Sequence, residues 1–76
     1  MSARVVISGY YGFDNAGDEA VLAGLIDAFQ AAVPELSIAV ASANPEATRR
    51  QHGVDAFHRY RWREFRAQLQ ACDVFV

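Results

Sequence analysis

One stretch of the sequence, GYYGFDNAGDEAVL at residues 9–22, points to both a fold and a ligand site. It follows the apolar, β-branched run Arg4–Ser8, which is typical of a buried strand in a parallel sheet. Three glycines with Asp14-Asn15 predict a loop, and from Asp18 onward apolar residues recur at spacings of three and four, which predicts a helix. Open α/β sheets bind ligands where such a strand passes through a loop into a helix.

The rest of the chain continues the alternation of strand and helix. Acids in the first turn favour the first helix, and Pro34 ends it. Its apolar stripe is expected to contain Val21, Leu22, Leu25, Ile26, Phe29 and Val33. The sequence then predicts a strand over Leu36–Ala41, a helix from Asn44-Pro45-Glu46 to Gly53, an extended piece over Val54–Phe57, a helix over Trp62–Ala71 and a strand over Asp73–Val76. Trp62, Phe65 and Leu69 are expected to share the buried stripe of that last helix.

This order of elements predicts an α/β fold with a doubly wound, Rossmann-like parallel sheet. Three or four strands with these helices form only half of such a sheet, and the final strand ends on Phe75-Val76 without a turn. We therefore interpret residues 1–76 as the N-terminal part of a Rossmann-like domain in a longer protein.

Composition excludes several classes of function. The 76 residues carry a formal net charge of −2 with no lysine, which argues against a nucleic-acid binder. One cysteine, Cys72, excludes disulfide-rich and zinc-ribbon domains, and no apolar run approaches the length of a membrane span. A soluble cytoplasmic protein is the expectation. Residues 1–48 hold six acids and one arginine while residues 49–76 hold six arginines and three acids, a pattern that indicates two differently charged solvated faces.

The loop fits neither common nucleotide-binding motif. Its glycines at positions 9, 12 and 17 are three and five residues apart, so the G-x-G-x-x-G fingerprint is absent. Gly12 and Gly17 match the glycine spacing of a P-loop, but Asp18 and Glu19 replace its Lys and Ser/Thr. Two carboxylates oppose a phosphate, whereas carboxylate and amide groups bind sugar hydroxyls well. The sequence therefore favours a hydroxyl-rich ligand.

A purely structural interpretation of the same residues stays open. Asn15 is a candidate N-cap with Asp18 at the third helical position, and Glu19 complements the helix dipole. Tyr10 and Tyr11 are amphipathic rings that suit packing better than stacking on a sugar.

The run G-Y-Y-G-F-D-N-A-G-D-E-A-V-L, with N-A-G-D-E-A-V-L on residues 15–22, resembles the N-terminal signature of polysaccharide pyruvyl transferases, most closely those of the CsaB type. Weaker similarity continues through Ala43-Asn44-Pro45, Arg59 and Ala71-Cys72-Asp73-Val74. Family members are several times longer and continue with a serine- and glycine-rich loop.

The resemblance implies a GT-B-like, two-domain enzyme that moves a pyruvyl group from phosphoenolpyruvate onto a cell-wall or exopolysaccharide precursor as a ketal on two hydroxyls. It implies no metal and no organic cofactor. Its donor-binding and acid residues are expected mainly beyond residue 76, so residues 1–76 alone are expected to be inactive. Carried onto this sequence, the expected catalytic residues are Asn15 and Asp18, and the expected substrate-binding residues are Tyr11, Gly12, Gly17, Glu19 and Arg59.

The expected partners are a small-molecule donor and a saccharide or lipid-linked saccharide acceptor, with peripheral association at the inner face of the membrane as an option. The oligomeric state and the acceptor are left open. Two alternatives also stay open: a GT-B-like glycosyltransferase that uses a nucleotide-sugar, and a non-catalytic α/β ligand-binding module. His52 and His58 are expected at the surface, and Arg61, Arg63 and Arg66 on a solvated helix face.

Overall fold

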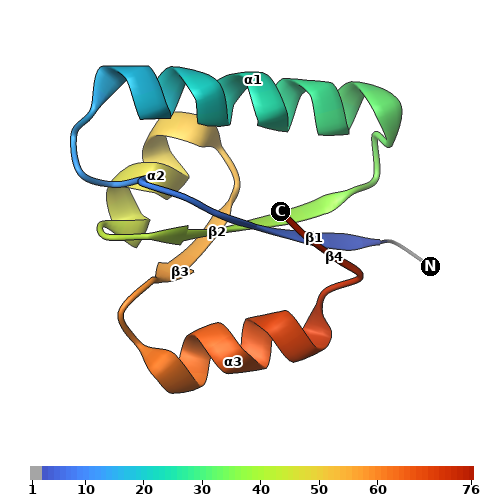
Figure 1. Ribbon diagram of the computed structural model, residues 1–76. Coiled ribbons are helices and arrows are strands. Elements are labelled where there is room, and N and C mark those ends of the chain that lie inside the picture. The colour runs from blue at the N-terminus through green and yellow to red at the C-terminus, as the bar shows by residue number, and fades with distance from the viewer. Residues whose placement is uncertain (1–2) are drawn as a thin grey trace.

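The computed structural model describes residues 3–76 as a parallel sheet between two layers of helices (Figure 1). Helices α1 and α2 cover one face of the sheet, and α3 covers the other. In chain order the elements are β1 (Arg4–Ser8), α1 (Ala16–Ala32), β2 (Ser37–Ser42), α2 (Pro45–His52), β3 (Asp55–His58), α3 (Trp62–Ala71) and β4 (Val74–Phe75). The expected order and types of element are confirmed, with small shifts at the ends of α1, β2, β3 and β4.

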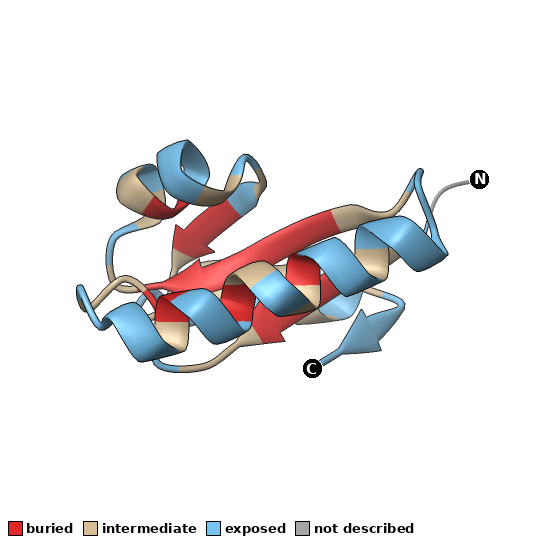
Figure 2. Ribbon diagram, turned by 90° about the horizontal axis from the view of Figure 1, so that it is seen from above, coloured by how far each residue is buried: buried red, intermediate tan, exposed pale blue. Residues whose placement is uncertain are grey.

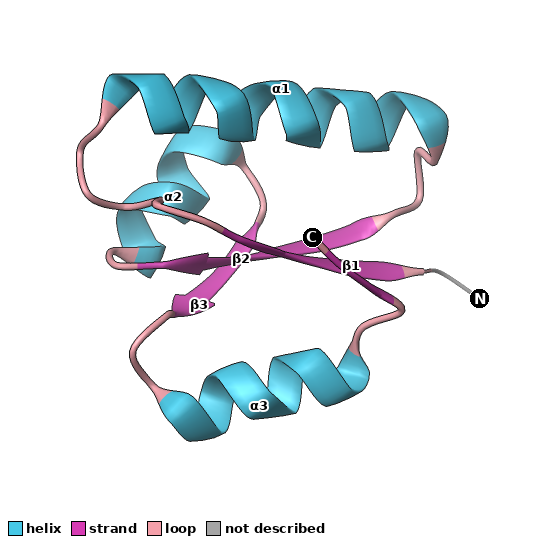
Figure 3. Ribbon diagram, viewed as in Figure 1, coloured by secondary structure: helices cyan, strands magenta, loops and turns pink. Residues whose placement is uncertain are grey.

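The strand order is β3-β2-β1-β4, and all three pairings are parallel. The chain therefore winds outward from β1 to β3 on one side and crosses to the other side of β1 through α3. This is a doubly wound arrangement, with its topological switch beside β1. The loops that follow β1, β2 and β3 all lie at one end of the sheet (Figure 3), which we call the carboxyl edge.

The core is divided by the sheet into two clusters. Val5 and Ile7 of β1 pack with Leu22 and Ile26 of α1, whereas Val6 faces the cluster that receives α3. This alternation explains why β1 is apolar on both faces, as the sequence predicts. The central strands are buried, whereas β4 is exposed (Figure 2).

Three residues of the predicted apolar stripes are not buried. Val21 is 58% exposed on α1, Val33 is 45% exposed at the C-cap of α1, and Trp62 is 70% exposed at the first position of α3. Their prediction as core residues is wrong. The α1 stripe narrows to Leu22, Leu25, Ile26 and Phe29, and the α3 contact to Phe65 and Leu69. Val21 lies outside the buried face of α1 that Leu22 and Ile26 form, and Val33 and Trp62 lie at helix ends, where solvent reaches the side chain.

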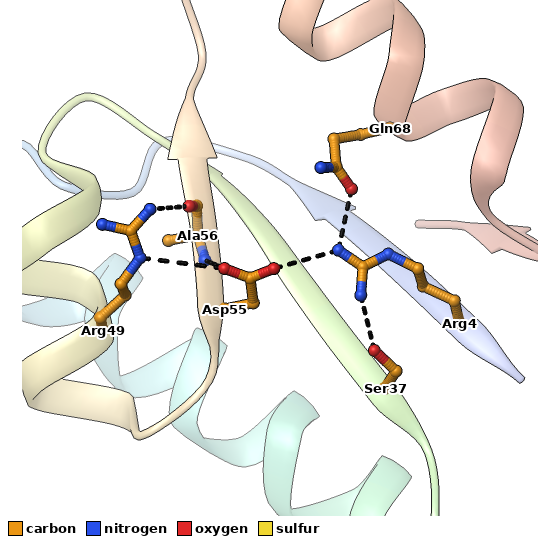
Figure 4. A network of polar contacts seen from close by, with 6 residues as sticks. All are labelled: Arg4, Ser37, Arg49, Asp55, Ala56 and Gln68. Atoms are coloured by element: carbon orange, nitrogen blue, oxygen red, sulfur yellow. Dashed lines mark hydrogen bonds and ion pairs between the residues drawn. The ribbon is translucent and has the colours of Figure 1, made fainter. Parts of the chain in front are cut away.

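The opposite end of the sheet, the amino edge, is joined by a polar network centred on Arg4 (Figure 4). The Arg4 guanidinium donates to Ser37 Oγ at 2.6 Å, to Asp55 Oδ2 at 3.1 Å and to Gln68 Oε1 at 2.9 Å. Arg49 of α2 approaches the other oxygen of Asp55 at 3.8 Å. One side chain of β1 thereby links β2, β3 and α3.

Within residues 3–76, no helix combines the length and the apolar character that crossing a bilayer requires.

Candidate functional site

The loop after β1 is held tightly against the loop after β2, and Gly12 permits the contact. Its φ is +82°, and a Cβ there would lie 2.6 Å from the backbone nitrogen of Asn44 and 2.8 Å from that of Ala43. The same Ala43 nitrogen donates to the carbonyl oxygen of Tyr11 at 3.0 Å. The structure thus gives Gly12 a folding role: no larger residue fits between the two loops.

Asn15 is the N-cap of α1, as the structural interpretation predicts. Its Oδ1 accepts from the backbone nitrogen of Asp18 at 3.2 Å, which satisfies one of the free N–H groups of the first turn. Within residues 3–76, neither the Asn15 amide nitrogen nor the Asp18 carboxylate forms a hydrogen bond, so one cap bond leaves both groups able to meet a ligand. Asn15 is exposed and Asp18 is half-buried.

Glu19 lies below this surface, where both of its oxygens are engaged. Oε2 accepts from the Gly12 backbone nitrogen at 3.2 Å, and Oε1 lies 3.1 Å from Nε2 of His52. The two side chains are 10% and 5% exposed, respectively. The expectation that His52 sits at the surface is therefore wrong: its imidazole, at the end of α2, is drawn inward by the Glu19 carboxylate. Glu19 ties together the loop, α1 and α2.

Tyr11 is in the core rather than in the open loop. The residue is 6% exposed and packs with Ile7 and Leu22, and its ring fills the space above Gly9, where a Cβ would lie 2.6 Å from the ring. Burial, reinforced by the nearby carboxylates of Asp18 and Glu19, raises the pKa of the Tyr11 phenol above its ordinary value. Tyr11 supports the site from beneath.

Arg59, directly after β3, reaches across the end of β2 to the loop after β1. Its Nη1 donates to the carbonyl oxygen of Gly9 at 2.8 Å. Its guanidinium carbon lies 5.1 Å from the ring centre of Phe13 and 5.5 Å from that of Tyr60. The placement of Arg59 at the carboxyl edge thus joins two loops that are far apart in the sequence.

Two rings lie beside this arginine, and a third ring stacks on one of them. Tyr10 stacks on Phe13 with ring centres 4.0 Å apart, and Phe13 meets Tyr60 edge to face at 6.5 Å. We call Tyr10, Phe13 and Tyr60 the aromatic platform. Tyr10 is 54% exposed and Tyr60 is 66% exposed, so the platform faces solvent at the carboxyl edge.

A groove of about 740 Å³ opens between α1 and α2 beside the loop. Glu19 and His52 contribute to its wall, together with Asp14 from the loop and Asn44 from the start of α2. Four alanines also line it, namely Ala16, Ala20, Ala23 and Ala47. The small side chains leave space between the two helices, and the polar groups lie around it.

The predicted site residues are thus brought to one edge of the sheet but at different depths. Asn15, Asp18 and Gly17 lie at the start of α1, and Arg59 reaches the preceding loop, whereas Tyr11 and Glu19 are buried beneath. His58 is half-buried, with Nδ1 3.3 Å from the Tyr60 backbone nitrogen, and Arg61, Arg63 and Arg66 are exposed as expected. Phe13, Tyr60 and His52 were not predicted as site residues, and the pairing of His52 with the predicted residue Glu19 was not foreseen.

The sequence offers one signal of the aromatic platform, the adjacency of Tyr60 to Arg59. The three rings come from two loops about 50 residues apart, so no local pattern predicts that they meet. No group of three or more His, Cys, Asp or Glu in the described part of the chain is arranged to hold a metal ion. Comparison of the chain with family models, with curated proteins and with solved structures gives no match in any of the three.

Proposed function

We propose that this chain forms the acceptor-side wall of a polysaccharide pyruvyl transferase, which transfers a pyruvyl group from phosphoenolpyruvate to a saccharide. One observation carries the proposal. The N-A-G-D-E-A-V-L motif at residues 15–22 starts α1 at the carboxyl edge of β1, next to the switch in winding. Among residues 3–76, the Asn15 amide nitrogen and the Asp18 carboxylate have no hydrogen-bond partner.

The proposed reaction has simple chemical requirements. A proton adds to the terminal carbon of the enol, two saccharide oxygens bond to the adjacent carbon, and phosphate leaves with its bridging oxygen. One hydroxyl proton replaces the proton consumed at carbon, and the other leaves with phosphate or a base. The product is a ketal that carries a methyl group and a carboxylate. The site must therefore orient two hydroxyls and neutralise an anionic donor.

The residues at the carboxyl edge suit the acceptor half of this task. The Asn15 amide donates to a hydroxyl oxygen, and the Asp18 carboxylate accepts a hydroxyl proton as a hydrogen bond or as a base. The Arg59 guanidinium uses one of its five donors on Gly9 and has others for the donor carboxylate. GT-B-like architecture, with the opposite wall supplied by a second domain, is part of the proposal.

The test is acceptor-dependent release of phosphate. The full-length protein that contains these residues is incubated with phosphoenolpyruvate and with nucleotide-linked or lipid-linked saccharides. Inorganic phosphate and the ketal product are then measured. Phosphate release that requires a saccharide supports the proposal. Transfer from a nucleotide-sugar alone would instead identify a glycosyltransferase, and binding without transfer would identify a ligand-binding module.

A pair of arginine variants makes the test specific to this site. Arg59→Lys keeps the positive charge but loses the planar set of donors, and we expect turnover to fall about tenfold to a hundredfold. Arg66→Lys changes an exposed arginine on α3 in the same way and should leave turnover unchanged. Equal turnover by the two variants would contradict the role given to Arg59.

A further inference from the structure

The aromatic platform has no role in the core. Tyr10, Phe13 and Tyr60 are outside both buried clusters, and two of the three rings are more than half exposed. They are nevertheless ordered against one another, by a stack, an edge-to-face contact and the Arg59 guanidinium between Phe13 and Tyr60. Exposed apolar rings gathered in this way at a ligand-binding edge mark a contact surface.

The polar groups around the platform select the chemistry of the ligand. Asp14 and Asn15 follow Phe13 directly in the loop, and Asp18 is the third residue of α1, so two carboxylates and an amide lie next to the platform in the sequence. Asp14 also lines the groove between α1 and α2. These carboxylates disfavour the phosphates that accompany a nucleobase. They suit hydroxyl groups, and the aromatic faces suit the apolar C–H face of a sugar ring.

We propose that the aromatic platform is a pyranose-binding subsite, in which a sugar ring stacks on Tyr60 or Tyr10 while its hydroxyls meet Asp14 and Asn15. This inference rests on the proposed function, because it assigns the place of the acceptor saccharide. Arg59 orders the platform by holding Phe13 and Tyr60 around its guanidinium and the Gly9 carbonyl at its end. The sugar is thereby placed beside the start of α1.

Binding is measured without any donor, so that it does not depend on turnover. The full chain is titrated with methyl pyranosides of glucose, mannose, galactose and N-acetylglucosamine, followed by saturation-transfer NMR, and with uridine monophosphate as the competing ligand class. We expect Tyr60→Ala and Tyr10→Ala each to weaken binding of the best pyranoside about three- to tenfold. Tyr60→Phe keeps the ring and should retain most of the affinity.

Trp62→Ala is the matched control. Trp62 is 70% exposed and, in the described part of the chain, neither stacks on nor meets edge to face any ring of the platform. Its loss should leave pyranoside affinity unchanged. Circular dichroism verifies that each variant is folded, which is expected because the substituted rings are exposed.

The outcomes separate this inference from the proposed function. Pyranoside binding that needs Tyr10 and Tyr60 upholds the subsite even where phosphoenolpyruvate is not consumed, in which case the transferase proposal alone fails. Three results would overturn the subsite. The wild-type chain does not bind a pyranoside, or all variants bind it equally well. In the third, Tyr10→Ala and Tyr60→Ala lose binding of uridine monophosphate rather than of a pyranoside.

Discussion

The two edges of the sheet use similar side chains in opposite ways. At the amino edge, the side chains of Ser37, Asp55 and Gln68 all accept hydrogen bonds from the Arg4 guanidinium. At the carboxyl edge, the Asn15 amide nitrogen and the Asp18 carboxylate have no hydrogen-bond partner within residues 3–76, and aromatic rings stand in solvent. Each edge has an arginine that spans strands, Arg4 at one and Arg59 at the other.

The difference indicates which polar residues build the fold and which are available to a ligand. Arg4 uses its guanidinium on three protein side chains, whereas the guanidinium of Arg59 makes one hydrogen bond, to the Gly9 carbonyl, among the described residues. Parallel α/β sheets bind ligands at the carboxyl ends of their strands, where the loops diverge and helix N-termini converge. Changes at the amino edge should therefore alter stability, and changes at the carboxyl edge should alter binding.

The largest loss of stability is expected at Gly12, where the two loops of the carboxyl edge contact each other. Gly12→Ala places a methyl group against the backbone of Ala43 and Asn44 at a φ of +82°, and we expect a loss of about 2–4 kcal/mol in the free energy of unfolding. Gly53→Ala is the control, because Gly53 has a φ of +68° but no atom within 4 Å of the added Cβ. It should cost only about 1–2 kcal/mol. Urea denaturation measures both, and equal losses would show that the contact with the second loop is unimportant.

The second-largest loss of stability is expected from disruption of the Arg4 network at the amino edge. Arg4→Met removes the donors to Ser37 and Gln68 but keeps the apolar stem, and we expect a loss of about 1–2 kcal/mol in the free energy of unfolding. The ion pair with Asp55 contributes little of this, because the Asp55 side chain is 53% exposed. Pyranoside affinity of the folded protein should not change. Arg66→Met, at an exposed position of α3, is the control. A fall in pyranoside affinity with Arg4→Met would contradict the assignment of stability to the amino edge and of binding to the carboxyl edge.

Sequence patterns predict the fold of this chain well because they are local. The β-branched run Arg4–Ser8, the Asn44-Pro45 helix start and Gly53 each encode their own element, and all three lie where predicted. The site is predicted less well, because how deeply each site residue is buried depends on tertiary contacts. Glu19 and His52 are 33 residues apart, so neither signals that the other will bury it. The outward position of Trp62 likewise depends on how α3 crosses the sheet.

The start of α1 allows the cap and the proposed site to be separated. Asn15→Ala should cost about 1 kcal/mol of stability through the lost cap, whereas Asn15→Ser should keep most of it, because a serine hydroxyl can accept the same hydrogen bond. Asp18→Asn preserves the backbone donor and should cost only a few tenths of a kcal/mol. If Asn15 and Asp18 act on the acceptor, Asn15→Ser and Asp18→Asn both lower acceptor-dependent turnover. Normal turnover by these two stable variants would leave only the capping role.

A smaller effect, confined to alkaline solution, should arise from Tyr11 beneath the carboxyl edge. Burial, together with the Asp18 and Glu19 carboxylates, raises the pKa of its phenol above 10.0, so the folded state favours the neutral form. The resulting stability is complete below the ordinary pKa and is lost as the pH rises through the folded-state pKa. Tyr11→Phe should flatten this part of the stability profile, and Tyr60→Phe, at an exposed ring, should not. Denaturation midpoints between neutral and strongly alkaline pH test the difference.

The smallest changes in stability are expected from alanine substitutions of two glycines in α1. These variants also test whether a ligand approaches the backbone of the helix. Gly17 and Gly24 both lie in α1, and an added Cβ would meet only Asn15 Oδ1 at 3.4 Å in the first case and nothing within 4 Å in the second. Because alanine favours a helix over glycine, Gly24→Ala should raise stability by about 0.5–1 kcal/mol and Gly17→Ala, in the first turn, by less. Only Gly17 lies at the carboxyl edge, where a saccharide would approach the first turn of the helix. We therefore expect Gly17→Ala alone to weaken pyranoside binding. Unchanged affinity in both variants would mean that the ligand does not approach the backbone at Gly17, and that the carboxyl edge binds through its side chains alone.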